Sequence, residues 1–416
     1  MSEATPLWNL APIVRLALLG LALALAPLAW VWLRHRQVEP ARRLRALTLV
    51  TLFLTFDLVL FGAFTRLTDS GLGCPDWPGC YGSVSPVGAS AQIAAAEQQM
   101  PDGPVTIEKA WIEMIHRYLA TAVGVLITVM TVTAWALHRK VRDAAAPSVL
   151  LSPWWPTATL VWVCLQGLFG ALTVTMKLYP AIVTAHLLGG LTLLVLLSLQ
   201  AEGYRQRQGS SRAGFFDATA QPRRWRMALA LLALLSGLQI ALGGWVSTNY
   251  AVLACTDFPT CHGQWWPEMD FAQGFAVQRQ LGLNAQGGTL EMDALTAIHY
   301  THRLMAYAVL AALLAVAWGL WRHTAHGRSP AAAAASAALD GSASPGASGA
   351  SRAGWRRWAL FFAGVALWQA ATGVSNVVLG WPLLAAVSHT GGAAALVVGL
   401  ATLWMRARSV ESGLQP

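Results

Sequence analysis

The sequence predicts an all-α polytopic membrane protein, made of two pseudo-repeated four-helix bundles plus one extra N-terminal transmembrane helix. Composition is the first reason, because 56% of the residues are hydrophobic and 11% are charged, whereas soluble domains carry roughly 25% charged residues. The second reason is a series of apolar segments long enough to cross a bilayer. The third is that one half of the chain repeats the other.

A helix needs about 20 mostly apolar residues to cross a bilayer. Segments of this kind alternate with polar or basic stretches and predict about nine spans. These spans are expected at residues 11–33, 44–64, 111–137, 156–176, 181–201, 226–248, 295–321, 355–378 and 382–405. Between the second and third spans, an Ala-rich stretch around Gln92–Met100 indicates a short surface helix.

Arginine and lysine orient these spans. They gather after the first, third, fifth and seventh spans and again after the ninth, and positively charged loops remain in the cytoplasm. The N-terminus is therefore predicted outside and the C-terminus inside. The net charge of +9 is explained by this topology and by contact with anionic membrane lipid, so it gives no reason to expect a nucleic-acid partner.

The first span has an alternative interpretation as a secretory signal peptide, because Leu21–Ala26 resembles the apolar core of such a peptide. Two observations favour a retained helix. The segment is long for that core, and the arginine cluster follows it, whereas a signal peptide carries its positive charge before the apolar core. We therefore expect residues 11–33 to be a retained anchor.

The two halves share a loop with the same pattern of cysteine, aspartate and proline. Residues 62–82 read GAFTRLTDSGLGCPDWPGCYG, and residues 243–263 read GGWVSTNYAVLACTDFPTCHG. A second match follows at Gln166-x-x-x-Gly170 and Gln369-x-x-x-Gly373. Because an even number of spans separates equivalent segments, spans two to five are expected to be repeated by spans six to nine in the same orientation. This is a parallel repeat, as in some transporters.

The repeat sets the expected domain boundaries. They are an anchor and basic linker at 1–43, a first bundle at 44–202, a cytoplasmic linker at 203–225, a second bundle at 226–405 and a tail at 406–416. Within the second bundle, residues 329–354 are mostly Ala, Ser, Gly and Pro. Such a segment cannot bury enough apolar surface to fold, which predicts disorder.

Four cysteines lie in the repeated outer loops, Cys74 with Cys80 and Cys255 with Cys261. Paired thiols facing an oxidising compartment usually form disulfides. We favour two structural disulfides, Cys74–Cys80 and Cys255–Cys261, and redox-active thiols remain the alternative. A zinc site is disfavoured because the loops offer no further matched ligands.

Four histidines, His116, His186, His302 and His389, lie near the predicted outer ends of four spans. Histidine inside a membrane is costly unless it has a partner. A lone one could be a satisfied core residue or part of a proton relay, but these four occur at matched depth on the second and fourth helices of each predicted bundle. Facing imidazoles could ligate a haem iron from both sides.

Residues near these histidines fit the same interpretation. Glycine pairs follow His186 and His389, at Gly189-Gly190 and Gly391-Gly392, and would let a flat macrocycle approach the backbone. The side chains of Arg66, Arg117 and Arg303 are expected toward the same face, where they could pair with haem propionates. For Arg66, contact with lipid headgroups is an equally good explanation.

One mismatch separates the two predicted pockets. Glu113 lies one turn before His116, whereas the second half has His299 at the equivalent position. A carboxylate in one of two otherwise duplicated sites suggests that this site performs chemistry while the other holds or transfers electrons. The structural alternative is that Glu113 benefits from the positive end of its helix.

These motifs together resemble the haem A synthase family, whose members oxidise haem O to haem A in the membrane. The resemblance covers spans two to nine and rests on residues 62–78, Glu113-x-x-His116-Arg117, Ala185-His186-Leu, Ile298-His299-Tyr-Thr-His302-Arg303 and Ser388-His389. The extra N-terminal helix and an outer insert at 84–110 depart from the eight-span pattern of the family. These departures leave the motif residues untouched.

The resemblance implies a substrate and a cofactor. Haem O would lie between His116 and His186 beside Glu113, and haem b between His302 and His389. The C8 methyl group of haem O would be oxidised to a formyl group by successive hydroxylations, with Glu113 positioning water or stabilising a cationic intermediate. Electrons would pass toward the second haem, and Cys74 and Cys80 would take part in the family's redox handling.

The resemblance also implies a location and partners. The protein would lie in a bacterial-type inner membrane with its haem sites toward the periplasm. Its partners would be an electron acceptor of unknown identity, haem O synthase and cytochrome oxidase assembly factors, and homo-oligomerisation is left open.

Two other classes of function have to be weighed. A di-haem b-type electron-transfer protein without substrate oxidation is the main alternative, but a wire across the membrane would place histidines at both depths. A transporter would be expected to have an acidic site at mid-membrane. Asp57 in the second span is a candidate, yet it has no acidic match in the second half.

Overall fold

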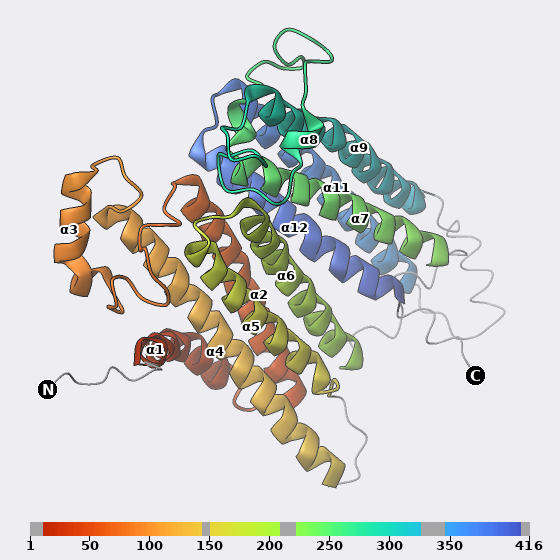
Figure 1. Cartoon of the computed structure of the whole chain (residues 1–416). Coiled ribbons are helices and arrows are strands. Elements are labelled where there is room, and N and C mark those ends of the chain that lie inside the picture. The colour runs from red at the N-terminus through yellow and green to blue at the C-terminus, as the bar shows by residue number, and fades with distance from the viewer. Residues whose placement is uncertain (1–10, 144–149, 209–221, 326–345, 409–416) are drawn as a thin grey trace, which may run out of the picture.

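The computed structural model describes residues 11–143, 150–208, 222–325 and 346–408, which form an all-α membrane protein (Figure 1). Within these ranges, nine helices are long and apolar enough to cross a membrane. They are α1 (Ala11–Arg34), α2 (Pro40–Leu67), α4 (Ile107–Asp143), α5 (Trp154–Thr175), α6 (Pro180–Arg207), α7 (Pro222–Thr248), α9 (Met292–Ala325), α11 (Gly346–Val378) and α12 (Leu383–Arg408). The shorter helices are η1 (Pro86–Ala89), α3 (Ser90–Gln99), η2 (Ala251–Leu253) and α8 (Phe271–Gly274).

Each predicted span coincides with one of these helices, and most helices extend beyond the apolar segment. Helix α6 continues to Arg207 and α7 begins at Pro222, so the linker predicted at 203–225 is shorter than expected, and residues 209–221 lie outside the described residues. Polar residues continue these helices because a helix satisfies its own backbone hydrogen bonds beyond the membrane as well as within it. Helix α3 confirms the surface helix predicted around residues 92–100.

Disorder was predicted for residues 329–354. The structure has helix α11 beginning at Gly346, within that segment. Residues 329–345 lie outside the described residues, and their disorder stays a prediction.

The long helices gather in two groups of four. We call α2, α4, α5 and α6 the first bundle, and α7, α9, α11 and α12 the second. Helices α6 and α12 lie at the contact between the bundles, α6 packing on α7 and α12, and α12 on α2. Helix α1 packs outside the first bundle, mainly on α4, and the second bundle has no counterpart to it among the described residues (Figure 1).

Equivalent positions of the repeat contact each other where the bundles meet. Arg66 of α2 donates a hydrogen bond to the backbone oxygen of Ser247 in α7, at 2.6 Å. The Tyr250 hydroxyl donates to the Asp69 carboxylate, also at 2.6 Å. Both contacts join residues separated by 181 positions in the chain. The loops after α2 and after α7 are therefore held together by matching parts of the two halves.

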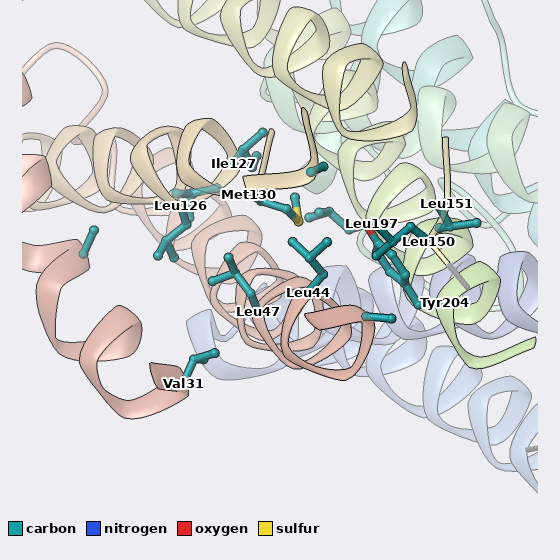
Figure 2. Packing of buried hydrophobic residues seen from close by; sticks show 14 of the residues in the cluster. Val31, Leu44, Leu47, Leu126, Ile127, Met130, Leu150, Leu151, Leu197 and Tyr204 are labelled. Atoms are coloured by element: carbon teal, nitrogen blue, oxygen red, sulfur yellow. The ribbon is translucent and has the colours of Figure 1, made fainter. Parts of the chain in front are cut away.

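The largest cluster of buried apolar side chains in each bundle lies toward the arginine-rich ends of the helices. In the first bundle, Leu44, Leu126 and Leu197 come from three different helices and are at most 2% exposed (Figure 2). Val31 of α1 joins the same cluster. The second bundle has an equivalent cluster around Leu229, Phe362 and Leu403. These clusters hold the helices together at one end of each bundle, and the histidines lie near the other end.

Prediction: the buried Glu202 carboxylate stabilises the contact between the bundles. It pairs with Arg205 of its own helix and with Arg406 Nε of α12, at 3.2 Å. Replacing it by glutamine should lower the free energy of unfolding by about 2–3 kcal/mol, below the usual cost of breaking a buried pair because both guanidinium groups are partly exposed. Thermal unfolding in detergent measures this. Glu268→Gln, at an exposed position, is the control. Equal midpoints for the two variants would contradict the prediction.

Candidate functional site

Each of the four predicted histidines lies against a glycine on a neighbouring helix of its bundle. A Cβ atom added at Gly62 would lie 3.0 Å from Cε1 of His116, and one at Gly243 would lie 2.9 Å from Cε1 of His302. The second histidine of each bundle repeats the pattern at longer range, with Gly170 and His186 at 3.5 Å and Gly373 and His389 at 3.5 Å. The imidazoles therefore occupy space that any larger residue at Gly62 or Gly243 would take.

The histidines of each bundle form a pair. His116 on α4 and His186 on α6 interact electrostatically, as do His302 on α9 and His389 on α12. His186 and His389 lie in the second turn of their helices, and His116 and His302 lie in the third. All four side chains keep some accessible surface although the helices surround them. We call the two sites the first and the second pocket.

The imidazoles of the second pocket are held by hydrogen bonds. His389 Nδ1 lies 2.8 Å from the Thr372 hydroxyl, which can accept the ring N–H and so leave Nε2 free for a ligand. The Gln239 amide nitrogen lies 3.1 Å from Nδ1 and 3.4 Å from Nε2 of His302, so this side chain contacts both ring nitrogens. Neither partner was predicted from the sequence, although each is a polar residue within an apolar span.

The imidazoles of the first pocket lack such partners. Nδ1 of His116 and Nδ1 of His186 are buried without a hydrogen bond to any described residue. The repeat places Leu58 where the second half has Gln239, and Phe169 where it has Thr372. The two pockets thus share their histidines and glycines but differ in how tightly the rings are oriented.

Glu113 is the centre of a buried network of one ion pair and one hydrogen bond, between the first pocket and the loop that follows α2. Its side chain is 5% exposed and lies one turn before His116 on α4. One carboxylate oxygen forms an ion pair with Arg117, and the other accepts a hydrogen bond from the Cys74 backbone N–H at 2.8 Å. The carboxylate therefore connects α4 directly to the outer loop that follows α2.

That loop is closed by the Cys74–Cys80 disulfide, and both cysteines are fully buried. Arg117 donates hydrogen bonds to the backbone oxygen atoms of Asp76 at 3.0 Å and Pro78 at 3.2 Å. The predicted disulfide is therefore present, and the loop is fixed over the outer end of α4. Whether the pair also has a redox role stays a prediction.

The second pocket has the same loop with an imidazole in place of the carboxylate. The backbone N–H of Cys255 points to His299 Nδ1 at 3.3 Å. Arg303 donates to the backbone oxygen atoms of Asp257 at 3.0 Å and Thr260 at 2.7 Å, and the Cys255–Cys261 disulfide is formed. The mismatch between Glu113 and His299 thus lies at one hydrogen-bonding position, and a neutral acceptor replaces a charged one.

The matched aspartates shape both loops. Asp257 accepts hydrogen bonds from the backbone N–H groups of His262 at 2.8 Å and Gly263 at 3.0 Å. The hydrogen bond from the Thr260 hydroxyl, followed by these two, lowers the pKa of Asp257 to about 2. Gly263 has a φ of +71°, where glycine is favoured. Asp76 makes the same contacts with Tyr81 and Gly82.

The predicted propionate-binding arginines have other partners in this structure. Arg117 and Arg303 donate to loop carbonyl groups, as described above. Arg66 pairs with Asp69 at 2.9 Å and stacks over the Tyr250 ring at 4.2 Å from its centroid. All three arginines lie beside the loops that follow α2 and α7, and their observed role is to hold these loops. Contact with propionates stays a prediction.

In the glycine pairs after His186 and His389, Gly189 and Gly392 face side chains of α5 and α11, whereas Gly190 and Gly391 face Val59 and Leu60 of α2. A Cβ atom at Gly189 would meet the Gln166 side chain, and one at Gly392 would meet Gln369 and Trp368. The Trp162 indole also donates to the backbone oxygen of Gly189 at 2.9 Å. These glycines let polar side chains of α5 and α11 pack closely, which the sequence could not reveal because the contacts join different helices.

Comparison with known proteins identifies relatives over most of the chain. Residues 45–341 match the family described as cytochrome oxidase assembly protein, COX15-CtaA. A heme A synthase of Shewanella oneidensis is 36% identical over 87% of this chain and 97% of the relative. Heme A synthases of Allorhizobium ampelinum and of a Methylobacterium strain are 28% and 27% identical, over 87% and 94% of this chain and over 90% and 99% of their own lengths. The chain belongs to the haem A synthase family.

Proposed function

We propose that this protein is a haem A synthase, an oxidoreductase that converts the C8 methyl group of haem O to a formyl group in haem A biosynthesis. The observation that carries the proposal is the difference between the pockets. A buried carboxylate lies one turn from a histidine in the first pocket, and a histidine replaces it in the second. Family membership supplies the substrate, because the relatives are heme A synthases.

The second pocket fits a resident haem b. His302 and His389 come from different helices and contact Gln239 and Thr372 respectively, and a pair of histidine imidazoles is a common ligand set that could hold haem iron. Glycines at 243 and 373 provide the space that the two imidazoles occupy. When bound, haem b would supply one-electron redox capacity. The residues of the chain orient the imidazoles and cover the pocket with the Cys255–Cys261 loop.

The first pocket fits a substrate that must enter and leave. Its imidazole Nδ1 atoms have no hydrogen-bonding partner among the described residues, so His116 and His186 can adjust as haem O binds and haem A departs. Leu58 and Phe169 replace the polar partners of the second pocket. Weaker orientation lowers affinity for iron but allows exchange, because second-shell hydrogen bonds raise metal affinity.

Glu113 is proposed to act on the methyl carbon of haem O. Two hydroxylations, each removing two electrons, would give a gem-diol that loses water to form the formyl group. A carboxylate held by Arg117 and by the Cys74 N–H can accept a proton from water or stabilise positive charge developing at the methyl carbon. The disulfide loop, by holding that N–H, fixes where the carboxylate points.

The remaining expectations follow from this function. The haem sites would face the periplasmic side of a bacterial-type inner membrane, because the histidines lie at the ends of the helices opposite the arginine-rich ends. Haem O synthase would deliver the substrate, and cytochrome oxidase assembly factors would receive the product. An electron acceptor would reoxidise the protein.

Prediction: Glu113→Gln should leave haem binding intact and reduce conversion of haem O by at least about 100-fold, because the amide cannot accept a proton. Chromatography of extracted haems measures conversion, and the optical spectrum measures binding. Glu108→Gln, at an exposed position of the same helix, is the control and should convert haem O normally. Full conversion by Glu113→Gln would refute the catalytic role and favour a di-haem electron-transfer protein.

Prediction: Gly243→Val should displace His302 and remove most of the resident low-spin haem, because the new Cβ would lie 2.9 Å from the imidazole. Gly237→Val is the matched control on the same helix, since a Cβ there meets nothing within 4 Å. Haem content per protein, from the pyridine haemochrome spectrum, distinguishes the two. Equal haem content in both variants would contradict the proposed position of the cofactor.

A further inference from the structure

An apolar groove of about 690 Å³ lies on the outside of the first bundle, between α1, α2 and α4. Helix α1 contributes Leu23, Pro27 and Trp30 to its walls. One charged side chain lines it, the carboxylate of Asp57 on α2. The groove lies within the membrane-spanning parts of these helices, so its natural occupant is a molecule with a long hydrocarbon portion.

Asp57 has no hydrogen bond or ion pair with any residue that the structure describes, and its side chain is exposed to the groove. An intramembrane carboxylate is costly without a partner, and such residues usually mark a functional site. A carboxylate facing an apolar groove is satisfied by a ligand that carries one hydrogen-bond donor on a hydrocarbon chain. An alcohol next to an isoprenoid tail has this chemistry.

The groove begins next to the first pocket. Leu119 lies one turn from His116 on α4, on the side of the arginine-rich end of the helix. Leu58 lies one turn from Gly62 on α2 in the same direction, and both leucines line the groove. A chain that leaves a macrocycle held at His116 toward the membrane interior would therefore reach the groove. Asp57 would lie near the start of that path.

The groove belongs to the first bundle alone among the described residues. The repeat places Leu238 where the first half has Asp57, and α1 has no counterpart beside the second bundle. The two proposed ligands also differ in whether they have a chain that could fill such a groove. Haem O carries a hydroxyethylfarnesyl chain, which is a hydroxyl group followed by an isoprenoid tail, on the pyrrole ring diagonally opposite one of the propionate-bearing rings. Haem b carries a vinyl group at that position.

We infer that this groove binds the hydroxyethylfarnesyl chain of haem O, with Asp57 accepting a hydrogen bond from its hydroxyl group. The inference rests on the proposed function and adds the feature that selects the farnesylated haem for the first pocket. With the propionates at the outer end, the chain points toward the deeper part of the bundle, where Asp57 lies. Asp57 is thus a specificity residue and does not touch the reacting methyl group.

The test compares the affinity of the first pocket for haem O and for haem b in the purified full-length protein, by absorbance titration. Asp57→Leu introduces the residue found at position 238. The Kd for haem O should rise about tenfold, the effect of losing one hydrogen bond to a charged group, and the Kd for haem b should change less than twofold. Asp57→Asn, which keeps an acceptor, should recover most of the affinity for haem O.

A second pair of variants tests the groove without changing Asp57. Leu23→Trp fills the groove from α1 and should weaken haem O binding but spare haem b. Leu21→Trp, at an exposed position of the same helix outside the groove, should change neither. Loss of both haems in Asp57→Leu, or unchanged haem O affinity in both Asp57→Leu and Leu23→Trp, would overturn the inference.

Two further results have a defined meaning. A phospholipid or quinone that stays in the groove while haem O binds normally would also overturn the inference. If the wild-type first pocket bound haem b but never haem O, the proposed function itself would fail. Haem O binding that is insensitive to these variants would leave the proposed function standing and reject only the role of the groove.

Discussion

The close approach of each histidine to a glycine on the neighbouring helix is the contact on which the rest of the site depends. Gly62 and Gly243 leave their imidazoles no room for a larger residue, so the spacing of α2 from α4 and of α7 from α9 fixes where the rings lie. The apolar clusters toward the arginine-rich ends, around Leu44 and Leu229, hold these helices together. The opposite ends of the helices carry the polar residues of the two pockets, the four histidines and Glu113.

Duplication gives two pockets of one design, and a few substitutions separate their proposed duties. The second pocket holds its rings through Gln239 and Thr372, which suits a cofactor that stays. The first has apolar residues in their place and gains Glu113, which is tied to Arg117 and to the disulfide loop. The repeat therefore supplies the scaffold, and the departures from it are the basis for proposing that the first pocket performs the oxidation.

The sequence predicted the spans, the parallel repeat and both disulfides, because hydrophobic length and matched motifs are local signals. It did not predict that α11 begins at Gly346. It also did not predict that Gly189 lies against Gln166, because this contact joins two different helices. The positions of the arginines along their helices follow from the sequence, whereas the hydrogen bonds from Arg117 to loop carbonyls depend on a loop conformation that no sequence period encodes. Gln239 and Thr372 could have been found from the sequence, because the first half has the apolar residues Leu58 and Phe169 at the equivalent positions.

The most direct measurement is to extract and identify the pigments of the purified protein after expression with and without a supply of haem O. The account predicts haem b in both preparations, with a low-spin bis-histidine spectrum, and haem O together with haem A only when haem O is supplied. Protein that contains no haem under haem-sufficient expression, or haem b alone despite abundant haem O, would contradict the account.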